Sequence, residues 1–490
     1  MNVKMLVYIL GKVLLIEGAL MLLPIACGLL YGEQVILSYI ILAALYSGIG
    51  FLVSMKKPEN MTVFIKDGCV ATALSWLVLS VCGCIPFILT GEIPSFTDAM
   101  FETASGFTTT GASILNNVEA LSHTSLFWRS LTHWIGGMGV LVFLLAVVPM
   151  TGGSNMNLMK AESPGPTVGK IVPKVRTAAK MLYYIYIAIT LLEIIILFAS
   201  GMPMFDSICS AFGTAGTGGF GIKNDSFASY APHIQWIVAV FMLMFGINFN
   251  LYYYFATRQA SKAWKLSEPK VYLAIAGVAT ALVCFSIYGI YGNLGESLRH
   301  ALFQVATTMT TTGFATADFD LWPALAKFVL VTLMFIGACA SSTGGGIKVS
   351  RFQIMIKAIR REIESYVHPR TVKKIHLDGK TIDTDVERSV ALYFFIYLLV
   401  LVLSMLIVSF EGHDLVTVFT SVTATLNNIG PGLSLVGPTH NYSFFSPLSK
   451  WVLIFDMIAG RLELIPVLVF INPLTYKGLF KKAQKSQGRH

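Results

Sequence analysis

Charged residues are scarce in this sequence. Asp, Glu, Lys and Arg make up 12% of the chain, about half of the roughly 25% that is usual in soluble domains. Hydrophobic residues make up 55%. Several stretches of about 20 residues carry at most one charge, which is long enough for a helix to cross the roughly 30 Å hydrocarbon layer of a membrane. The composition therefore excludes a soluble globular protein and indicates a polytopic integral membrane protein.

Motifs of enzymes and metal sites are lacking as well. The chain has no HExxH and no GxSxG, and "GGGIKVS" at 344–350 lacks the GK[ST] ending of a phosphate-binding loop. The run "GTGGFG" at 216–221 follows a membrane segment and not a strand, which argues against a dinucleotide site. The seven cysteines lie mostly in apolar segments, and Cys82 and Cys84 form CxC and not the CxxC of metal sites. We therefore expect structural thiols, no enzymatic activity and no cofactor in this chain.

The apolar segments and their flanking charges predict the topology. The first segment is long and contains Lys12 and Glu17, so we interpret it as a retained helix and not as a signal peptide. With both termini in the cytoplasm, the inward loops carry most of the Lys and Arg residues, which is typical of a cytoplasmic side. The outer face is then net acidic, which raises the local concentration of cations. The ten predicted spans lie at about 6–30, 35–54, 68–90, 126–150, 180–201, 233–256, 271–291, 323–348 (interrupted), 389–410 and 449–470.

The longest soluble stretch, 351–388, is basic and includes "KAIRREIESYVHPRTVKK". Two interpretations stay open. It is either an ordinary inward loop of the positive-inside kind or a docking surface for a cytosolic partner. Nothing in it indicates nucleic-acid binding.

Runs of glycine and hydroxyl residues occur four times in this apolar chain. They read "ASGFTTTGAS" at 104–113, "GTAGTGGFG" at 213–221, "ATTMTTTGFA" at 306–315 and "TATLNNIGPG" at 423–432. Each follows a segment that is too short to span the membrane, and a long apolar segment lies on either side. Asp98, Asp206 and Asp414 stand near the start of three of these segments, where a carboxylate caps a helix and complements its dipole. Each unit therefore predicts a helix, a re-entrant pore helix, a loop and a second helix.

Non-helical backbone at membrane depth survives only where it is buried in protein or lines a wet cavity. Four equivalent loops can converge on one axis, where a ring of carbonyls replaces the hydration shell of a cation. Glycine lets the backbone approach the ion closely. Helix-packing surfaces built from small residues are the alternative, but they explain one run more easily than four at matched positions. The predicted filter residues are Thr109, Thr110, Gly111, Thr217, Gly218, Gly219, Thr311, Thr312, Gly313, Asn428, Ile429 and Gly430.

The predicted fold is an all-α integral membrane protein with two N-terminal helices and four helix–pore loop–helix pseudo-repeats around one central pore. The predicted divisions are two N-terminal transmembrane helices (1–60), repeat 1 (61–160), repeat 2 (161–265), repeat 3 (266–365), a cytoplasmic linker (366–388), and repeat 4 with a basic tail (389–490).

Two membrane segments carry unusual residues. "GACASSTGGGIKVSRF" at 337–352 places consecutive glycines in mid-span, and each costs about 1 kcal/mol in a helix interior, so we expect an unwound segment over 337–348 and not a kinked helix. Arg461 lies in the last span between Asp456 and Glu463, and an arginine in mid-membrane is costly unless it faces protein or water. It either pairs with a carboxylate or acts in transport.

Several motifs jointly resemble one family over almost the whole chain. They are "HWIGGMG" at 133–139, "GTAGTGGFG", "SSTGGGIK" at 341–348, "YVHPR" at 366–370 and "GRLELIP" at 460–466. The chain resembles the Trk/Ktr/HKT superfamily of potassium transporters, and within it the membrane subunits of the bacterial Trk systems.

The resemblance implies potassium uptake across the bacterial inner membrane, with the potassium ion as substrate at the four aligned glycines. Gly111, where some relatives carry serine and pass sodium, points to potassium, although the fourth loop departs from the threonine-rich pattern. Arg461 is implied to project into the path near the filter and to lower flux by repulsion. A homodimer and a cytosolic TrkA-like nucleotide-binding ring on the inner face are the implied partners. An intramembrane gate loop is implied at Ser341, Ser342, Thr343, Gly344, Gly345, Gly346 and Lys348, the last of which would sense or repel cations.

Two rival hypotheses remain. A proton- or sodium-coupled potassium symporter needs a protonatable group in the path, for which Glu193, Asp456 and Glu463 are candidates. A membrane-embedded enzyme or receptor that uses the pocket above the filter would conduct no ions.

Overall fold

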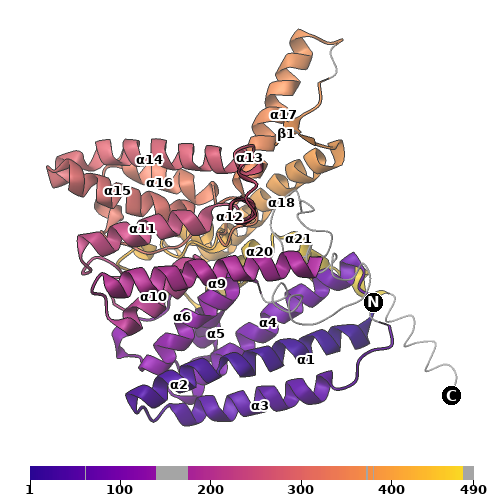
Figure 1. The fold of residues 1–490 in the computed structure, drawn as a ribbon, viewed down its shortest axis with the longest axis vertical. Helices are drawn as coiled ribbons and strands as arrows, with labels where there is room; N and C mark the ends of the chain where they lie inside the picture. Colours follow the sequence, from indigo (N-terminus) through magenta and orange to yellow (C-terminus); the bar gives the residue numbers. More distant parts are fainter. Residues whose placement is uncertain (61, 140–174, 371–372, 379, 478–490) are drawn as a thin grey trace.

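The computed structural model describes residues 1–60, 62–139, 175–370, 373–378 and 380–477. Within these residues the protein is helical, apart from a hairpin of two short antiparallel strands, β1 (His376–Leu377) and β2 (Lys380–Thr381), in the predicted linker. The predicted all-α membrane architecture is confirmed. Figure 1 shows the helices as one bundle from which α17 projects.

The chain begins with three helices that precede the first repeat, namely α1 (Val3–Leu20), α2 (Leu22–Tyr31) and α3 (Ile36–Ser54). The first two make one predicted span. α1 packs closely on α3 because glycines let the two backbones approach: a Cβ added at Gly18 would lie 2.8 Å from the nitrogen of Ser47, and one at Gly50 would lie 2.6 Å from that of Leu15. Such small-residue contacts are typical of helix pairs in membranes.

The same order of helices then occurs four times. Repeat 1 contains α4 (Ile65–Leu89), α5 (Phe96–Phe107) and α6 (His123–Met138), and repeat 2 contains α9 (Val175–Ala199), α10 (Met204–Gly216), α11 (Pro232–Gly246) and α12 (Phe249–Ala256). Repeat 3 contains α14 (Glu268–Tyr291), α15 (Leu294–Met309), α16 (Ala324–Phe335) and α17 (Val349–Val367). Repeat 4 contains α18 (Thr384–Val408), α19 (Leu415–Leu426), α20 (Pro447–Arg461) and α21 (Ile465–Ile471). Short pieces connect them: α13 (Ala260–Ala263) and the 3-10 turns η1 (Val118–Ala120), η2 (Phe319–Leu321), η3 (Ser409–Glu411) and η4 (Ser434–Val436). A further 3-10 turn, η5 (Pro473–Tyr476), follows α21.

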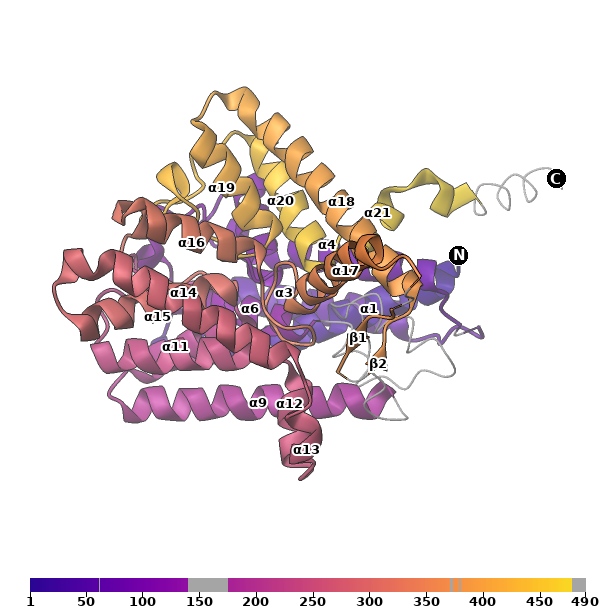
Figure 2. The same cartoon turned by 90° about the horizontal axis from the view of Figure 1, so that it is seen from above.

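The repeats follow one another around the bundle. The second long helix of each repeat packs against the pore helix of the next: α6 on α10, α11 on α15, α16 on α19, and α20 back on α5. Figure 2 shows part of this circuit, from α9 and α11 through α14, α15 and α16 to α19 and α20. The packing therefore closes on itself and brings the four pore helices, α5, α10, α15 and α19, to the centre.

The long helices differ from the predicted spans in two places. In the described ranges, six helices are long and apolar enough to cross a membrane, and α11 with α12 would make a seventh but for a bend of 89°. The continuous span expected at 233–256 is therefore wrong. The bend is stabilised because the side chain of Asn248 caps α12, while the loop after α16 donates from Cys339 N to Gly246 O over 3.0 Å. The second part of the span expected at 126–150, from residue 140 on, lies outside the described residues.

The last span, expected at 449–470, is also interrupted. α20 ends at Arg461, and Glu463 and Leu464 have φ of 58° and 64°, which a right-handed helix does not allow. Pro466 then stands in the first turn of α21, a position that tolerates a residue without an N–H. The break leaves Arg461 at a helix end, where its side chain reaches other segments.

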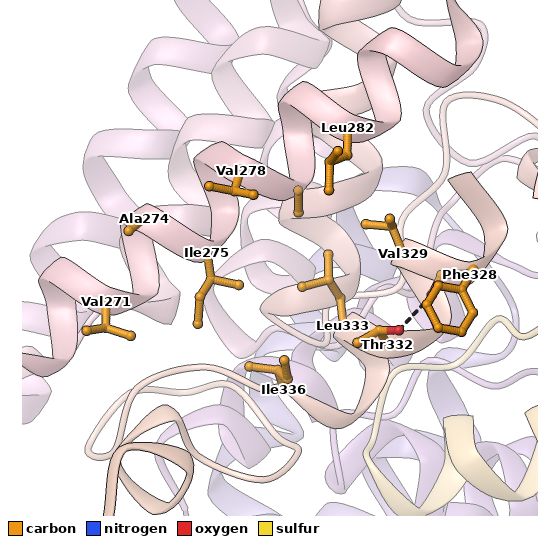
Figure 3. Close-up of a pocket in the computed structure, with 11 residues that line it drawn as sticks. Val271, Ala274, Ile275, Val278, Leu282, Phe328, Val329, Thr332, Leu333 and Ile336 are labelled. Atoms are coloured by element: carbon orange, nitrogen blue, oxygen red, sulfur yellow. Dashed lines mark hydrogen bonds between the residues drawn. The ribbon is translucent and has the colours of Figure 1, made fainter. Parts of the chain in front are cut away.

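An apolar groove of about 430 Å³ lies between α14 and α16. Figure 3 shows Val271, Ile275 and Val278 of α14 facing Val329 and Leu333 of α16 across it, while the Thr332 hydroxyl donates to Phe328 O. Ile336 lines its end, immediately before the interrupted segment. Exposed side chains around the groove, such as Phe328, suit a lipid-facing surface of a spanning helix pair.

Candidate functional site

Each pore helix ends in the same turn. In all four, one backbone N–H donates to the carbonyl five residues earlier over 2.8 Å, which is the long bond of a Schellman motif. The donors are Thr110, Gly218, Thr312 and Ile429. The residue before each donor is left-handed: Thr109 (φ 55°), Thr217 (55°), Thr311 (59°) and Asn428 (56°). Glycine usually holds this position, so four residues with side chains there mark a strained backbone that the surrounding packing maintains.

A glycine with positive φ follows two residues after each of these positions. The values are 80° at Gly111, 79° at Gly219, 90° at Gly313 and 93° at Gly430. In a regular strand, successive residues point to opposite sides. Left-handed residues at alternate positions reverse this pattern and let successive carbonyls point the same way.

The four turns close a ring through their glycines. A Cβ added to each glycine would collide with a carbonyl oxygen of the next repeat, and the fourth would meet the first. The distances are 2.2 Å from Gly111 to Gly218 O, 2.0 Å from Gly219 to Thr312 O, 2.2 Å from Gly313 to Ile429 O and 2.7 Å from Gly430 to Thr110 O. Only a residue without a side chain fits such an approach. We call residues 109–111, 217–219, 311–313 and 428–430 the four-loop ring.

The fourth loop is held differently from the threonine-rich ones. In repeats 1 and 3, hydroxyls pair over 2.8 Å, Thr108 with Thr110 and Thr310 with Thr312. In repeat 4, Asn428 Nδ2 instead donates to Thr110 Oγ1 (3.0 Å) and to Met457 O (2.8 Å). Asn428 therefore ties the fourth loop to the first and to α20.

We expect Asn428→Gly to lower discrimination between potassium and sodium by about threefold or more, because the tie to Thr110 is lost while glycine suits the left-handed backbone. Tracer uptake into liposomes under each gradient measures this. Asn293→Gly, at the exposed start of α15, is the control and should leave discrimination unchanged. Equal discrimination in Asn428→Gly and the wild type would contradict the role of this tie.

Side chains of α6 in repeat 1 form hydrogen bonds with the segments next to the first two loops. His133 Nδ1 donates to Gly106 O (2.7 Å), and its Nε2 accepts from Phe220 N (3.1 Å), so the imidazole is the neutral tautomer that joins α5 to the segment after the second loop. Arg129 donates to Glu102 (2.6 Å) and to Gly221 O (2.9 Å). Sequence reasoning missed these supporting residues, although charges within apolar segments were a usable signal.

The acidic residues predicted at the pore-helix starts are present there. Asp98 pairs with Lys450 (2.6 Å), and Asp206 accepts from Tyr230 (2.7 Å). Asp414 caps α19, and the hydrogen bonds from Thr417 hold the pKa of this carboxyl below its ordinary value. Asp414 therefore stays ionised down to a lower pH than a free aspartate. Its negative charge lies at the N-terminus of α19, where it interacts favourably with the helix dipole.

A polar cavity of about 190 Å³ lies on one side of the ring. The four ring glycines line it together with the amide side chains of Asn116, Asn224 and Asn441. The amides offer both donors and acceptors to hydrated solutes. The ring is therefore accessible from this side, which is the predicted outer one.

The intramembrane loop (337–348) lies against the other side of the ring. An isolated bridge between Ile336 and Ile347 closes its base. At its tip, Gly345 N donates to Thr311 Oγ1 (2.6 Å), and Thr217 Oγ1 donates to Thr343 O (3.1 Å). The unwound segment expected from the glycines is present, and its tip contacts the left-handed residues of two ring loops.

Two positively charged side chains donate hydrogen bonds to the carbonyls of this loop. Lys348 is 2% exposed, and its ammonium donates to Gly344 O and Gly345 O. Arg461 donates to Thr343 O (2.8 Å), and also to Gly136 O (2.6 Å) and Gly137 O (2.8 Å) at the end of α6. Arg461 therefore links the loop to repeat 1.

The predicted carboxylate candidates lie elsewhere. Glu463 forms an ion pair with Arg351, Asp456 accepts from Ser404 (2.7 Å), and Glu193 is fully buried in α9. None of these contacts within the described residues places a carboxylate in the ring.

The chain is similar to known transport proteins in both sequence and structure. A family model described as TrkH, cation transport protein, matches residues 32–285 and 289–476. The Trk system potassium uptake protein TrkH of Salmonella typhimurium is 34% identical over 489 residues, covering 97% of this chain and 100% of the relative. The Trk system potassium uptake protein TrkG of Escherichia coli K12 is 31% identical over 479 residues, covering 96% and 98%. The crystal structure of the potassium transporter TrkH from Vibrio parahaemolyticus superposes with a TM-score of 0.88 at 31% identity, covering 97% of this chain and 100% of that one.

Proposed function

The chain belongs to the TrkH family of cation transport proteins, and from this we propose that it takes up potassium across the bacterial cytoplasmic membrane through the four-loop ring. Its relatives are potassium uptake proteins and not enzymes. The rival hypothesis of a membrane-embedded enzyme is therefore abandoned.

The observation that carries the proposal is the closed circuit of glycines and carbonyls. Each glycine faces a carbonyl oxygen of the next loop at a distance that no side chain would allow. A ring of carbonyls offers a potassium ion oxygen ligands in place of its hydration water. The driving force would be electrical, about 2.3 kcal/mol per charge for each 100 mV.

We further infer that residues 341–346 and Lys348 form a gate. The loop tip bonds to Thr217 and Thr311 of the ring, on the side away from the polar cavity, so an ion that leaves the ring inward meets the loop. The loop has to move for ions to pass. Arg461 supports the closed position through its bond to Thr343 O and adds a positive charge that repels cations.

Two partners are proposed for the predicted cytoplasmic side. They are a second copy of the chain and a cytosolic TrkA-like nucleotide-binding ring, which would bring the nucleotide site that we do not expect in this chain. The support is α17, which projects from the bundle in Figure 1 and carries an apolar stripe of Ile356, Ile359, Ile363 and Tyr366, exposed by 50%, 54%, 60% and 81%. Such a stripe beside basic residues is typical of a surface that another protein covers.

Ion flux in liposomes containing the purified protein tests the proposal. We expect potassium-selective uptake that reverses at the potassium equilibrium potential. A reversal potential that depends on proton or sodium gradients would instead support the symporter. Glu193 and Asp456 are then the first candidates, because both are fully buried and have carboxylate oxygens without a hydrogen-bond partner in the described ranges. No flux from folded protein, with or without the partner ring, would overturn the pore.

A further inference from the structure

A buried carboxylate holds both ends of the intramembrane loop. Glu268 is the first residue of α14 and is 5% exposed. Its Oε1 accepts from Ala340 N (2.8 Å), near the start of the loop, and from Ser350 N (3.0 Å), just after its end. One oxygen atom therefore fixes the separation of the two loop flanks, through bonds that are stronger than those of a neutral acceptor.

The same side chain reaches the bend in repeat 2. Glu268 Oε2 accepts from Asn248 Nδ2 (3.2 Å), and the neighbouring Phe249 N donates to Ser341 O of the loop (3.0 Å). Three segments thus meet at this carboxylate: the start of α14, the bend between α11 and α12, and the intramembrane loop. A movement of any one of them changes the bonds of the others, because a buried carboxylate is costly to leave without partners.

The residue before Glu268 contacts the hairpin of the linker. Asp378, in the turn between β1 and β2, accepts from both the N–H and the hydroxyl of Ser267, each over 2.7 Å. Ser267 directly precedes Glu268 and stands at the N-cap position of α14. The exposed hairpin is therefore bonded to the helix start that presents the carboxylate to the loop.

We propose that Glu268 is the latch that holds the intramembrane loop closed, and that the Asp378–Ser267 contact lets the cytoplasmic hairpin control this latch. Glu268 touches neither the ring nor the ion, so it is a positioning residue. The inference rests on the proposed role of the loop as a gate. A partner that pulls on the hairpin would shift the start of α14 and release both loop flanks together.

Glu268→Gln and Glu268→Ala test the latch by potassium flux in liposomes without a partner. We expect flux to rise by about fivefold or more, more in Ala than in Gln because the amide oxygen still accepts a hydrogen bond. The ratio of potassium to sodium flux should stay that of the wild type, because the ring is untouched. General damage to the structure would lower flux or discrimination, so the direction separates the two. Glu362→Gln, an exposed carboxylate on α17, is the control.

The exposed Asp378 keeps the proposal testable if the Glu268 variants fail to fold. Asp378→Ala is expected to raise flux as well, and combining it with Glu268→Gln should add less than the two separate effects, since both act on one element. Unchanged or lower flux in folded Glu268 and Asp378 variants would overturn the latch. Failure of the transport proposal is distinguishable, because the wild type would then pass no potassium and a change at Gly111 would have no effect.

Discussion

Gly111→Ser is expected to reduce discrimination between potassium and sodium by tenfold or more, which corresponds to about 1.4 kcal/mol. A Cβ at this position would lie 2.2 Å from Gly218 O, and its φ of 80° is unfavourable for serine. The second loop has to move outward, so the spacing of the carbonyls around the ring changes. Uptake of potassium and of sodium into liposomes, each under its own gradient, measures the ratio.

Gly412→Ser is the matched control. Its φ is 77°, but an added Cβ there meets none of the described residues within 4 Å, so it carries the same backbone strain without the collision. We expect it to keep the wild-type ratio and to be slightly less stable. If both variants behaved alike, strain and not ring geometry would explain the effect, and the filter proposal would lose its main support.

Arg461→Ala is expected to raise potassium flux about tenfold while the protein still folds. The variant loses the bonds to Thr343 O, Gly136 O and Gly137 O, and hydrogen bonds from a charged group contribute about 1.5–3 kcal/mol each. Losing part of this stabilisation in the closed state alone shifts the proposed gate toward its open state. The variant also removes a positive charge next to the ring. Flux at a fixed membrane potential is the measurement.

Arg461→Lys separates the two causes. Lysine keeps the charge, but it lacks the planar fork that reaches carbonyls on two segments. Flux close to the wild type would mean that repulsion dominates, and flux close to Arg461→Ala would mean that the link between loop and α6 dominates. No change in either well-folded variant would show that Arg461 does not control transport.

The sequence predicts the fold well because its main determinants are local. The length of apolar segments identifies spans, and the four glycine runs, each after a short segment with a polar start, predict the pore helices. The breaks at Asn248 and after Arg461 were not predictable in the same way. The first segment is apolar enough for a continuous helix, and what interrupts it is a contact with another part of the chain, the bond from Cys339 to Gly246. In the second segment, Arg461 bonds to the intramembrane loop and to the end of α6.

In the candidate site as well, the residues set by the local sequence were predicted, and those set by distant contacts were not. The aligned glycines lie together in the ring, as expected, because each sits at one fixed point of a repeated unit. The supporting residues were missed because their partners lie far away in the chain: His133 bonds to Phe220, and Glu268 to Ala340. A histidine or glutamate beside an apolar segment has many structural uses, and only the packing of distant segments selects one. The roles of these residues stay predictions until the variants are measured.

The ring is built from one chain, which affects how such a protein can change. In a channel assembled from four copies of a subunit, any substitution in the filter is repeated on every side, so small alterations become large ones. Here the side carrying Asn428 and Ile429 differs from the two threonine-rich sides. In the proposed filter, a substitution in one loop therefore changes the ring at one of its four sides and leaves the other three as they are.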